Sequence, residues 1–282
     1  MKPIVSVIVP YYHGASRLDT ILAMMERNAQ VLREKRKEEM ELLFVNDSPE
    51  EALVISEQSL YSVKVLPNPK NMGIHASRVN GLIEAEGEYV HFLDQDDLIS
   101  DECLYSQLER IGKADFVIGN GYERQPDGTK KLIFSSAKKQ QCAADLNCHL
   151  FYNNLIRSPG QVLIRKNSIP SKWSENILKN NGSDDAFLWI LMLSSGRSAA
   201  INETPVYEHV YTGNNTSENT AGMLRSKKEA AKLLKGIVSP VGLWAIQRRA
   251  EYFCLKGSAH AFRYADVGLL RKIYAMRNIP KG

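Results

Sequence analysis

The sequence predicts an α/β protein built on a mostly parallel β-sheet with helices on both faces. Strand-like and helix-like segments alternate four times within the first 100 residues, and the apolar strands end in polar clusters. The length of 282 residues allows one large domain with an extension. With 44% hydrophobic and 24% charged residues the composition is that of an ordinary globular protein, which excludes a disordered or fibrous chain.

The elements of the first half follow from local patterns. A β-branched run at 5–9 predicts a strand that ends at Pro10, and apolar residues at helical spacing predict a helix over 16–39. The next predicted elements are a strand at 41–45, a helix at 50–59, a strand at 62–66, a helix at 73–86 and a strand at 89–93. Because ligands bind beyond the carboxyl ends of parallel strands, we expect the site there.

Beyond residue 100 the alternation weakens. Strands are predicted at 116–119 and 161–164, and the chain is helical and basic from about Ser226. We therefore divide the chain by expected role into a ligand-binding half at 1–100, a second half at 101–224 that binds a further substrate, and a basic helical extension at 225–282.

Three carboxylates follow the last strand of the first half directly, in Asp94-Gln95-Asp96-Asp97. Their mutual repulsion favours a bound cation, and carboxylate oxygens suit Mg²⁺ or Mn²⁺, which also bind substrate phosphates. The alternative is a solvated acidic turn with a helix N-cap, since Asp is also favoured there.

Four short motifs in this order resemble the family 2 glycosyltransferases of the GT-A fold. They are Val5–Tyr12, Phe44–Ser48, the Asn71-Met72-Gly73 segment with its helix, and the acidic cluster after Tyr89–Leu93. The resemblance covers residues 3–217 and implies a GT-A, Rossmann-like domain with a helical C-terminal extension. It further implies an inverting, metal-dependent hexosyltransferase that moves one sugar from a UDP-sugar to a hydroxyl of a glycan or lipid-linked acceptor, in bacterial cell-surface polysaccharide synthesis.

The resemblance assigns the donor-binding residues. Pro10 and Tyr11 match the segment that frames the nucleotide base, and Asp47 matches the aspartate that accepts a hydrogen bond from the uracil imide. Asn46 stands where the family often has Asp, which leaves dTDP and GDP open beside UDP. Arg78 matches the arginine near the donor phosphates.

The same resemblance implies a metal site. Asp94 and Asp96 match the family's DxD pair, which contacts the ribose and the metal-diphosphate, and Asp97 extends it. His209 lies where many relatives have a histidine near the metal or diphosphate. The expected ligands of Mn²⁺ or Mg²⁺ are thus Asp96, Asp97 and His209. A lone histidine is also common as a core or surface residue.

Inverting transfer needs a base that takes the proton of the acceptor hydroxyl. The segment Asn181–Trp189 resembles the family's acidic pair before a Leu-Trp helix, and the spacing to Trp189 favours Asp185 as the base, with Asp184 as the competitor. Both carboxylates would also suit the first turn of a helix without catalysis.

The charge is unevenly distributed. Residues 225–282 hold 13 Lys and Arg against 3 Asp and Glu, whereas residues 1–224 hold 23 against 29. The basic segment is either a solvated helical face or a peripheral contact with the inner face of the cell membrane, which we favour. We expect a cytoplasmic location, because no N-terminal apolar run is long enough for a signal peptide or span, and no nucleic-acid partner.

Two other classes share this pattern. Nucleotidyltransferases begin with a Gly-rich loop that grips a triphosphate, whereas the first loop here is Pro10-Tyr11-Tyr12-His13-Gly14. The remaining alternative is a catalytically silent GT-A-fold module that binds a nucleotide or sugar. The combination of Asp47, Arg78, the acidic cluster and the 184–185 pair favours an enzyme.

Overall fold

The computed structural model describes residues 2–213, 219–255 and 265–279, and these form two compact units. Unit 1 comprises Met1–Ile133, Arg157–Ile169 and Ser198–Thr212, and unit 2 comprises Phe134–Ile156, Pro170–Arg197 and Gly213–Gly282. The units thus interleave along the chain. The division by role at residues 100 and 224 stays a prediction, and 256–264 and 280–282 of the predicted extension lie outside the described residues.

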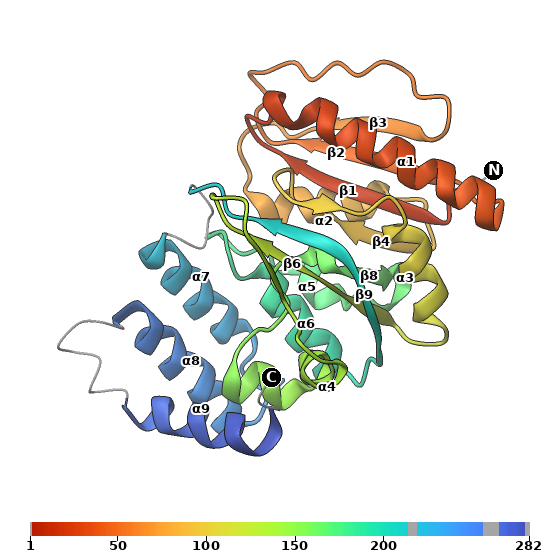
Figure 1. Ribbon diagram of the computed structural model, residues 1–282. Helices are drawn as coiled ribbons and strands as arrows, with labels where there is room; N and C mark the ends of the chain where they lie inside the picture. Colours follow the sequence, from red (N-terminus) through yellow and green to blue (C-terminus); the bar gives the residue numbers. More distant parts are fainter. Residues whose placement is uncertain (1, 214–218, 256–264, 280–282) are drawn as a thin grey trace. The chain divides into compact units, whose positions relative to one another are not determined.

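Unit 1 is a sheet with helices on it (Figure 1). Its helices are α1 (Leu18–Arg36), α2 (Ile74–Glu84) and α3 (Cys103–Ile111). Its strands are β1 (Val5–Tyr11), β2 (Met40–Asn46), β3 (Ser62–Pro67), β4 (Tyr89–Phe92), β5 (Leu98–Ile99), β6 (Phe116–Arg124), β7 (Lys130–Leu132), β8 (Val162–Arg165) and β9 (Ala199–Val210).

Within the described residues, nine strands form one sheet in the order β3-β2-β1-β4-β8-β6-β9-β5, with β7 paired to β6. The strands β3, β2, β1 and β4 are all parallel, which confirms the prediction for the first half. In the second half β8 runs antiparallel to β4 and to β6, and only the pair β6–β9 is parallel. The sheet as a whole is therefore mixed.

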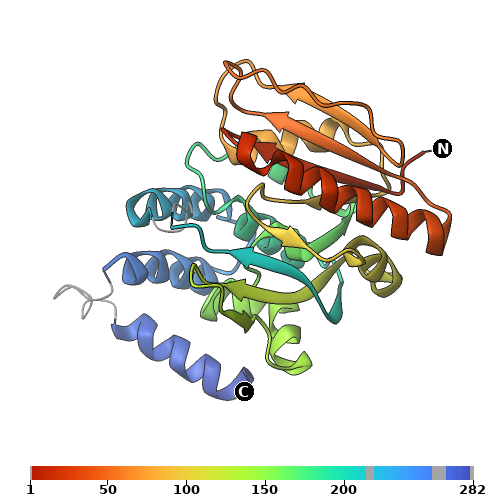
Figure 2. The same cartoon turned by 45° about the horizontal axis from the view of Figure 1, so that its top comes forward.

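Helices cover both faces of this sheet. Helix α2 packs closely on β1 and β2, where a Cβ added at Gly81 would lie 2.3 Å from a methyl of Ile8 and 3.1 Å from one of Val45. Helix α1 lies on the opposite face and packs beside α3, as the two views show (Figures 1 and 2). This arrangement leaves the carboxyl ends of the parallel strands to the loops, as the sequence predicts.

Two local predictions are wrong. Strand β1 does not end at Pro10 but continues to Tyr11, which pairs with Asn46 of β2. Strand β4 pairs with β1 only as far as Ile8, so the missing N–H of Pro10 removes no ladder bond on that side.

The predicted helix at 50–59 is absent, and the chain crosses irregularly from β2 to β3. Val54 is 85% exposed. The β-branched Val54 and Ile55 favour a helix less than unbranched residues do, and a short helix without a buried apolar face is marginal in water.

Unit 2 is helical within the described residues. The long helices are α6 (Asp184–Ser194), α7 (Thr220–Leu233), α8 (Pro240–Leu255) and α9 (Ala265–Asn278), which confirms the helical C-terminal region. The shorter elements are α4 (Ala137–Gln141), α5 (Ser171–Glu175) and a π-helical turn at Cys148–Tyr152. Arg249 of α8 is half-buried and donates to the backbone carbonyls of His149 (2.6 Å) and Leu150 (2.8 Å), so it fixes that turn to α8.

Two buried histidines predict acid sensitivity. Burial lowers the pKa of His91 in β4, and that of His149 in unit 2, to about 4. The unfolded chain binds these protons near pH 6.5 and the folded chain only near pH 4. The free energy of unfolding should therefore fall as the pH drops from 6.5 to 4, by up to about 3 kcal/mol per histidine.

Denaturant melts across this pH range check the expectation. In His91→Leu the slope of the unfolding free energy against pH should be shallower than in the wild type, whatever its stability at pH 8. An unchanged slope would assign the acid sensitivity to other groups.

Candidate functional site

The acidic loop, Asp94–Asp97, lies at the carboxyl end of β4 in unit 1. Just after β4, the backbone N–H of Leu93 donates to the carbonyl of Ile8 in β1 (2.9 Å), which attaches the start of the loop to the sheet. The N–H of Asp97 then donates to the carbonyl of Asp94 (3.1 Å), which closes a tight turn. The three carboxylates are thus held on one short turn at the end of the sheet where a ligand is expected.

Asp94 is bound from two sides. The guanidinium of Arg78, which is 3% exposed in α2, donates to Oδ1 of Asp94. The hydroxyl of Ser158 donates to Oδ2 (3.0 Å). The predicted phosphate-binding arginine therefore lies at the predicted DxD motif, and a guanidinium beside a carboxylate keeps that part of the loop close to neutral.

Asp97 is buried and binds the end of β9. Its carboxylate accepts hydrogen bonds from the hydroxyl of Tyr207, from Nδ1 of His209 (3.1 Å) and from the N–H of Val210 (3.1 Å). Tyr207 and His209 lie two residues apart on a strand and so face the same side. When Nδ1 of His209 donates to Asp97, its Nε2 is the acceptor, which is the arrangement in which a carboxylate orients a metal-binding histidine.

Asp96 is partly buried and lies close to two other carboxylates. Burial, followed by repulsion from Asp97 and Asp94, raises its pKa to about 6, against a smaller lowering by His209. The pKa of His209 is raised as well, because its hydrogen bond to Asp97 and the charges of Asp97, Asp94 and Asp96 outweigh the opposing effect of burial. The neighbouring carboxylates thus add to the effect of burial at Asp96 and oppose it at His209, and a cation would offset their negative charge.

The first loop is attached to the acidic loop by a pair of hydrogen bonds. The N–H of Tyr12 donates to Oε1 of Gln95 (3.0 Å), and Nε2 of Gln95 donates to the carbonyl of Tyr12 (2.8 Å). Tyr11 is 3% exposed and its ring packs edge-on against Phe44, at 5.9 Å between centroids, whereas Tyr12 is 47% exposed. The exposed aromatic ring of the first loop is therefore that of Tyr12.

Asp47, after β2, organises the loop before α2. Its Oδ1 accepts from the amide of Asn68 (2.7 Å) and the N–H of Met72 (2.7 Å), and its Oδ2 accepts from the N–H of Gly73 (2.9 Å). Gly73 has φ 87°, which favours glycine at this position. The predicted base-binding aspartate thus also fixes the loop that starts the helix carrying Arg78.

The acidic pair lies in unit 2, at the start of α6, as predicted. Asp184 is 2% exposed, and its backbone carbonyl accepts from the indole of the fully buried Trp173 (2.9 Å). Asp185 is half-buried, and its Oδ2 accepts from the side-chain amide of Asn154 (3.2 Å). Of the two carboxylic acids, Asp185 is the more accessible.

Four residues at these motifs were not predicted to act there: Gln95, Asn154, Ser158 and Tyr207. Period-two alternation with His209 could have indicated Tyr207. Nothing in the sequence around Ser158 indicates its bond to Asp94, 64 positions away. Nothing in the sequence pairs Asn154 with Asp185, 31 positions away.

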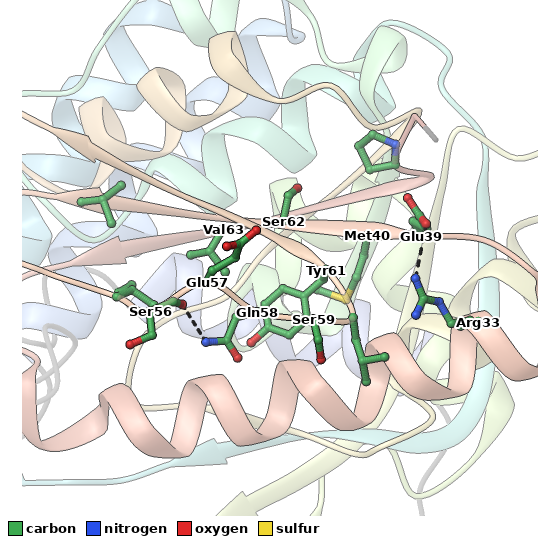
Figure 3. Close-up of a pocket in the computed structure, with 14 residues that line it drawn as sticks. Arg33, Glu39, Met40, Ser56, Glu57, Gln58, Ser59, Tyr61, Ser62 and Val63 are labelled. Carbon is green, nitrogen blue, oxygen red and sulfur yellow. Dashed lines mark hydrogen bonds and ion pairs between the residues drawn. The ribbon is translucent and has the colours of Figure 1, made fainter.

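One cavity of the described residues lies elsewhere. It has a volume of about 540 Å³ and is lined by Met40 and Ser62, the first residues of β2 and β3, and by the Arg33–Glu39 ion pair (Figure 3). This is the amino end of the strands, opposite to the acidic loop. The cavity is therefore not part of the predicted donor site.

The described residues contain neither a preformed metal cluster nor a membrane span. Among them, no three His, Cys, Asp or Glu side chains are grouped closely enough to hold a metal ion by themselves. No helix in the same residues is long and apolar enough to cross a membrane.

Three known glycosyltransferases resemble parts or all of this chain. A cholesterol galactosyltransferase of Borreliella burgdorferi is 34% identical over 124 residues, which are 42% of this chain and 32% of that protein. An uncharacterised glycosyltransferase of Haemophilus influenzae is 30% identical over 124 residues, 46% of its length. One of Rickettsia typhi is 25% identical over 287 residues, 96% of this chain and 80% of that protein. The chain thus matches less than half the length of the first two relatives.

The fold is also found among solved structures. S. aureus TarS 1-349 in complex with UDP-GlcNAc matches 99% of this chain and 76% of its own, with a TM-score of 0.59 at 16% identity, and the complex with UDP gives 0.57 at 18%. This likeness shows a common GT-A fold. The sequence pattern of the family described as glycosyl transferase family 2 matches residues 6–170. The chain therefore belongs to glycosyl transferase family 2.

Proposed function

We propose that the protein is an inverting glycosyltransferase that moves one sugar from a UDP-sugar to a hydroxyl of its acceptor. The observation that carries this is the acidic loop at the carboxyl end of β4, with Arg78 bound to Asp94 and His209 bound to Asp97. Family membership and the UDP-GlcNAc named for the TarS complex support the choice of donor.

In the proposed donor site, Arg78 and Asp94 act as a pair. Arg78 donates to the diphosphate, while Asp94 holds the guanidinium in place and binds the ribose hydroxyls. Pro10 and Tyr11 would frame the base through the backbone at the end of β1, because the ring of Tyr11 is buried against Phe44. Asp47 has a lone pair left on Oδ2 for the uracil imide while it fixes the 68–73 loop.

The residues around Asp96 suit a divalent cation. Mg²⁺ in nucleotide sites is commonly bound by one or two carboxylates together with substrate phosphates. Asp96 would supply the carboxylate and His209 a nitrogen, while Asp97, with three donors of its own, orients His209. A bound Mn²⁺ or Mg²⁺ would neutralise the diphosphate leaving group.

We assign the base to Asp185. Its carboxylate takes the proton of the acceptor hydroxyl while that oxygen bonds to the anomeric carbon, the bond from this carbon to the diphosphate oxygen breaks, and UDP leaves from the opposite face. The configuration inverts because the attack and the departure occur on opposite sides. Asp184 is the alternative, but its burial suits a structural role at the start of α6.

For the acceptor we propose a membrane-bound glycan or lipid, in the synthesis of cell-surface polysaccharide at the inner face of the cell membrane. The relative from B. burgdorferi carries the name of an enzyme that glycosylates a sterol, which supports a lipid-linked acceptor. The basic segment 225–282 would bring the enzyme to such a surface.

A panel of nucleotide sugars tests the donor. In the presence of Mn²⁺, the correct donor should raise the melting temperature. A ligand present at a free concentration of 100 times its Kd adds about 2.7 kcal/mol to the free energy of unfolding. The same donor should be hydrolysed or transferred, with release of UDP. Arg78→Lys should lose most of the stabilisation, whereas Arg17→Lys, outside the motifs, should keep it.

Stabilisation without any turnover on a broad set of acceptors would favour a silent nucleotide-binding module. No stabilisation by any nucleotide sugar would contradict the proposal.

A further inference from the structure

The C-terminal helices of unit 2 turn large apolar side chains outward. In α8 and α9 the exposed fractions are 62% for Val241, 41% for Trp244, 60% for Leu269 and 71% for Met276. Single exposed apolar residues are ordinary on protein surfaces. Four on two neighbouring helices mark a contact surface.

Helix α9 has two distinct faces. Val267 is 2% exposed, and Tyr274, one heptad later, stacks on Tyr152 at 6.3 Å between ring centroids and donates to Asp145 (2.9 Å). Leu269 and Met276 are also one heptad apart and lie on the opposite face. The inner face is therefore already packed, and the outer face carries two exposed apolar side chains.

The exposed face of α8 adjoins that of α9. Val241 and Trp244 lie one turn apart, and Arg248 is one turn beyond Trp244. Arg248 forms an ion pair with Asp266 of α9 (3.0 Å), one turn before Leu269. The ion pair thus links the exposed face of α8 to the exposed face of α9.

This surface is also positively charged. The three acidic residues of 225–282 are each engaged within unit 2: Glu229 with the N–H of Lys179 (2.8 Å), Glu251 with Lys228 (3.0 Å) and Asp266 with Arg248. Four cations of the segment are exposed and form no ion pair with an acidic residue among the described residues: Lys232, Lys235, Lys272 and Arg277. Lys272 lies between Leu269 and Met276 on the outer face of α9.

We propose that the exposed face of α8 and α9 binds an anionic lipid bilayer. Trp244, Leu269 and Met276 enter the interface between headgroups and acyl chains, and Lys272 and Arg277 contact anionic headgroups. A second copy of the chain fits less well, because two strongly basic segments would repel each other. The inference rests on the membrane contact proposed above for segment 225–282 and locates it on α8 and α9, and its test does not depend on the sugar donor.

Tryptophan fluorescence of the full chain tests this directly. Of the three tryptophans, Trp173 and Trp189 are fully buried, so a change of surroundings at the surface alters the emission of Trp244. Phosphatidylcholine vesicles that contain phosphatidylglycerol should shift the emission to the blue, and brominated acyl chains should quench it. Trp244→Phe should abolish both signals, whereas phosphatidylcholine alone should give little response.

Two variant pairs separate the apolar from the electrostatic contribution. Leu269→Ser with Met276→Ser should weaken vesicle partitioning by about tenfold or more, since both side chains lose their apolar burial in the bilayer. Lys272→Glu with Arg277→Glu should weaken it similarly and reduce its salt dependence. The matched control is Ile83→Ser on α2, because Ile83 is 68% exposed in unit 1.

Circular dichroism checks that the variants fold. An emission spectrum unchanged by anionic vesicles would overturn the proposal, and so would partitioning that neither variant pair alters. If the serine pair instead converted an oligomer into a monomer, without any vesicle binding by the wild type, the face would belong to a second copy of this chain.

Discussion

Asp185→Asn is expected to lower kcat by about 10³-fold while the affinity for the nucleotide sugar stays unchanged. An amide cannot take the proton of the acceptor hydroxyl at neutral pH, but it has nearly the size of the carboxylate. Asn154 can still contact the amide oxygen, so α6 should keep its position. Single-turnover kinetics with the donor identified by thermal stabilisation would measure the loss, and calorimetry would measure donor binding.

Asp184→Asn is the matched control for this experiment. Asp184 is 2% exposed at the first turn of α6, where a negative charge favours the helix N-terminus. Its amide variant should lose stability, with a much smaller effect on kcat. The reverse pattern, with the larger loss of kcat in Asp184→Asn, would move the base one residue earlier.

Asp96→Asn should separate activity from stability. The ionised Asp96 carboxylate is disfavoured in the folded chain, because burial and the charges of Asp97 and Asp94 raise its pKa to about 6. Between about pH 4 and pH 6 the folded chain binds the proton more tightly than the unfolded chain does, so this group removes stability as the pH rises through that window. Without metal at pH 7.5, the variant should be more stable by about 1–3 kcal/mol.

The same substitution should lower kcat/KM by about 10²–10³-fold, because a carboxylate that holds the metal-diphosphate is lost. Denaturant melts in EDTA and initial rates across a Mn²⁺ titration give the two quantities. Asp101→Asn serves as the control, since Asp101 is a surface residue paired with Arg27 (2.6 Å). If Asp96→Asn left the rate and its Mn²⁺ dependence unchanged, Asp96 would have no part in the metal site.

The sequence by itself determined the first half of the fold. The order of strands and helices up to β4 follows from local periodicity, and it places the polar ends of the strands at one edge of the sheet. The short motifs, which are chemically specific, also indicated the family. The helix expected at 50–59 does not form, and none of the apolar residues in this segment is fully buried, so a short helix there would lack a packed apolar face.

Only the tertiary structure decided which partners each site residue has. The bonds of Asp97 to Tyr207 and His209 join residues more than 100 positions apart, and the bond of Ser158 to Asp94 spans 64. Such contacts depend on the antiparallel second half of the sheet, where pairing is set by packing rather than by local propensity. The outward face of α9 could not be predicted either, because exposure depends on what the opposite face packs against.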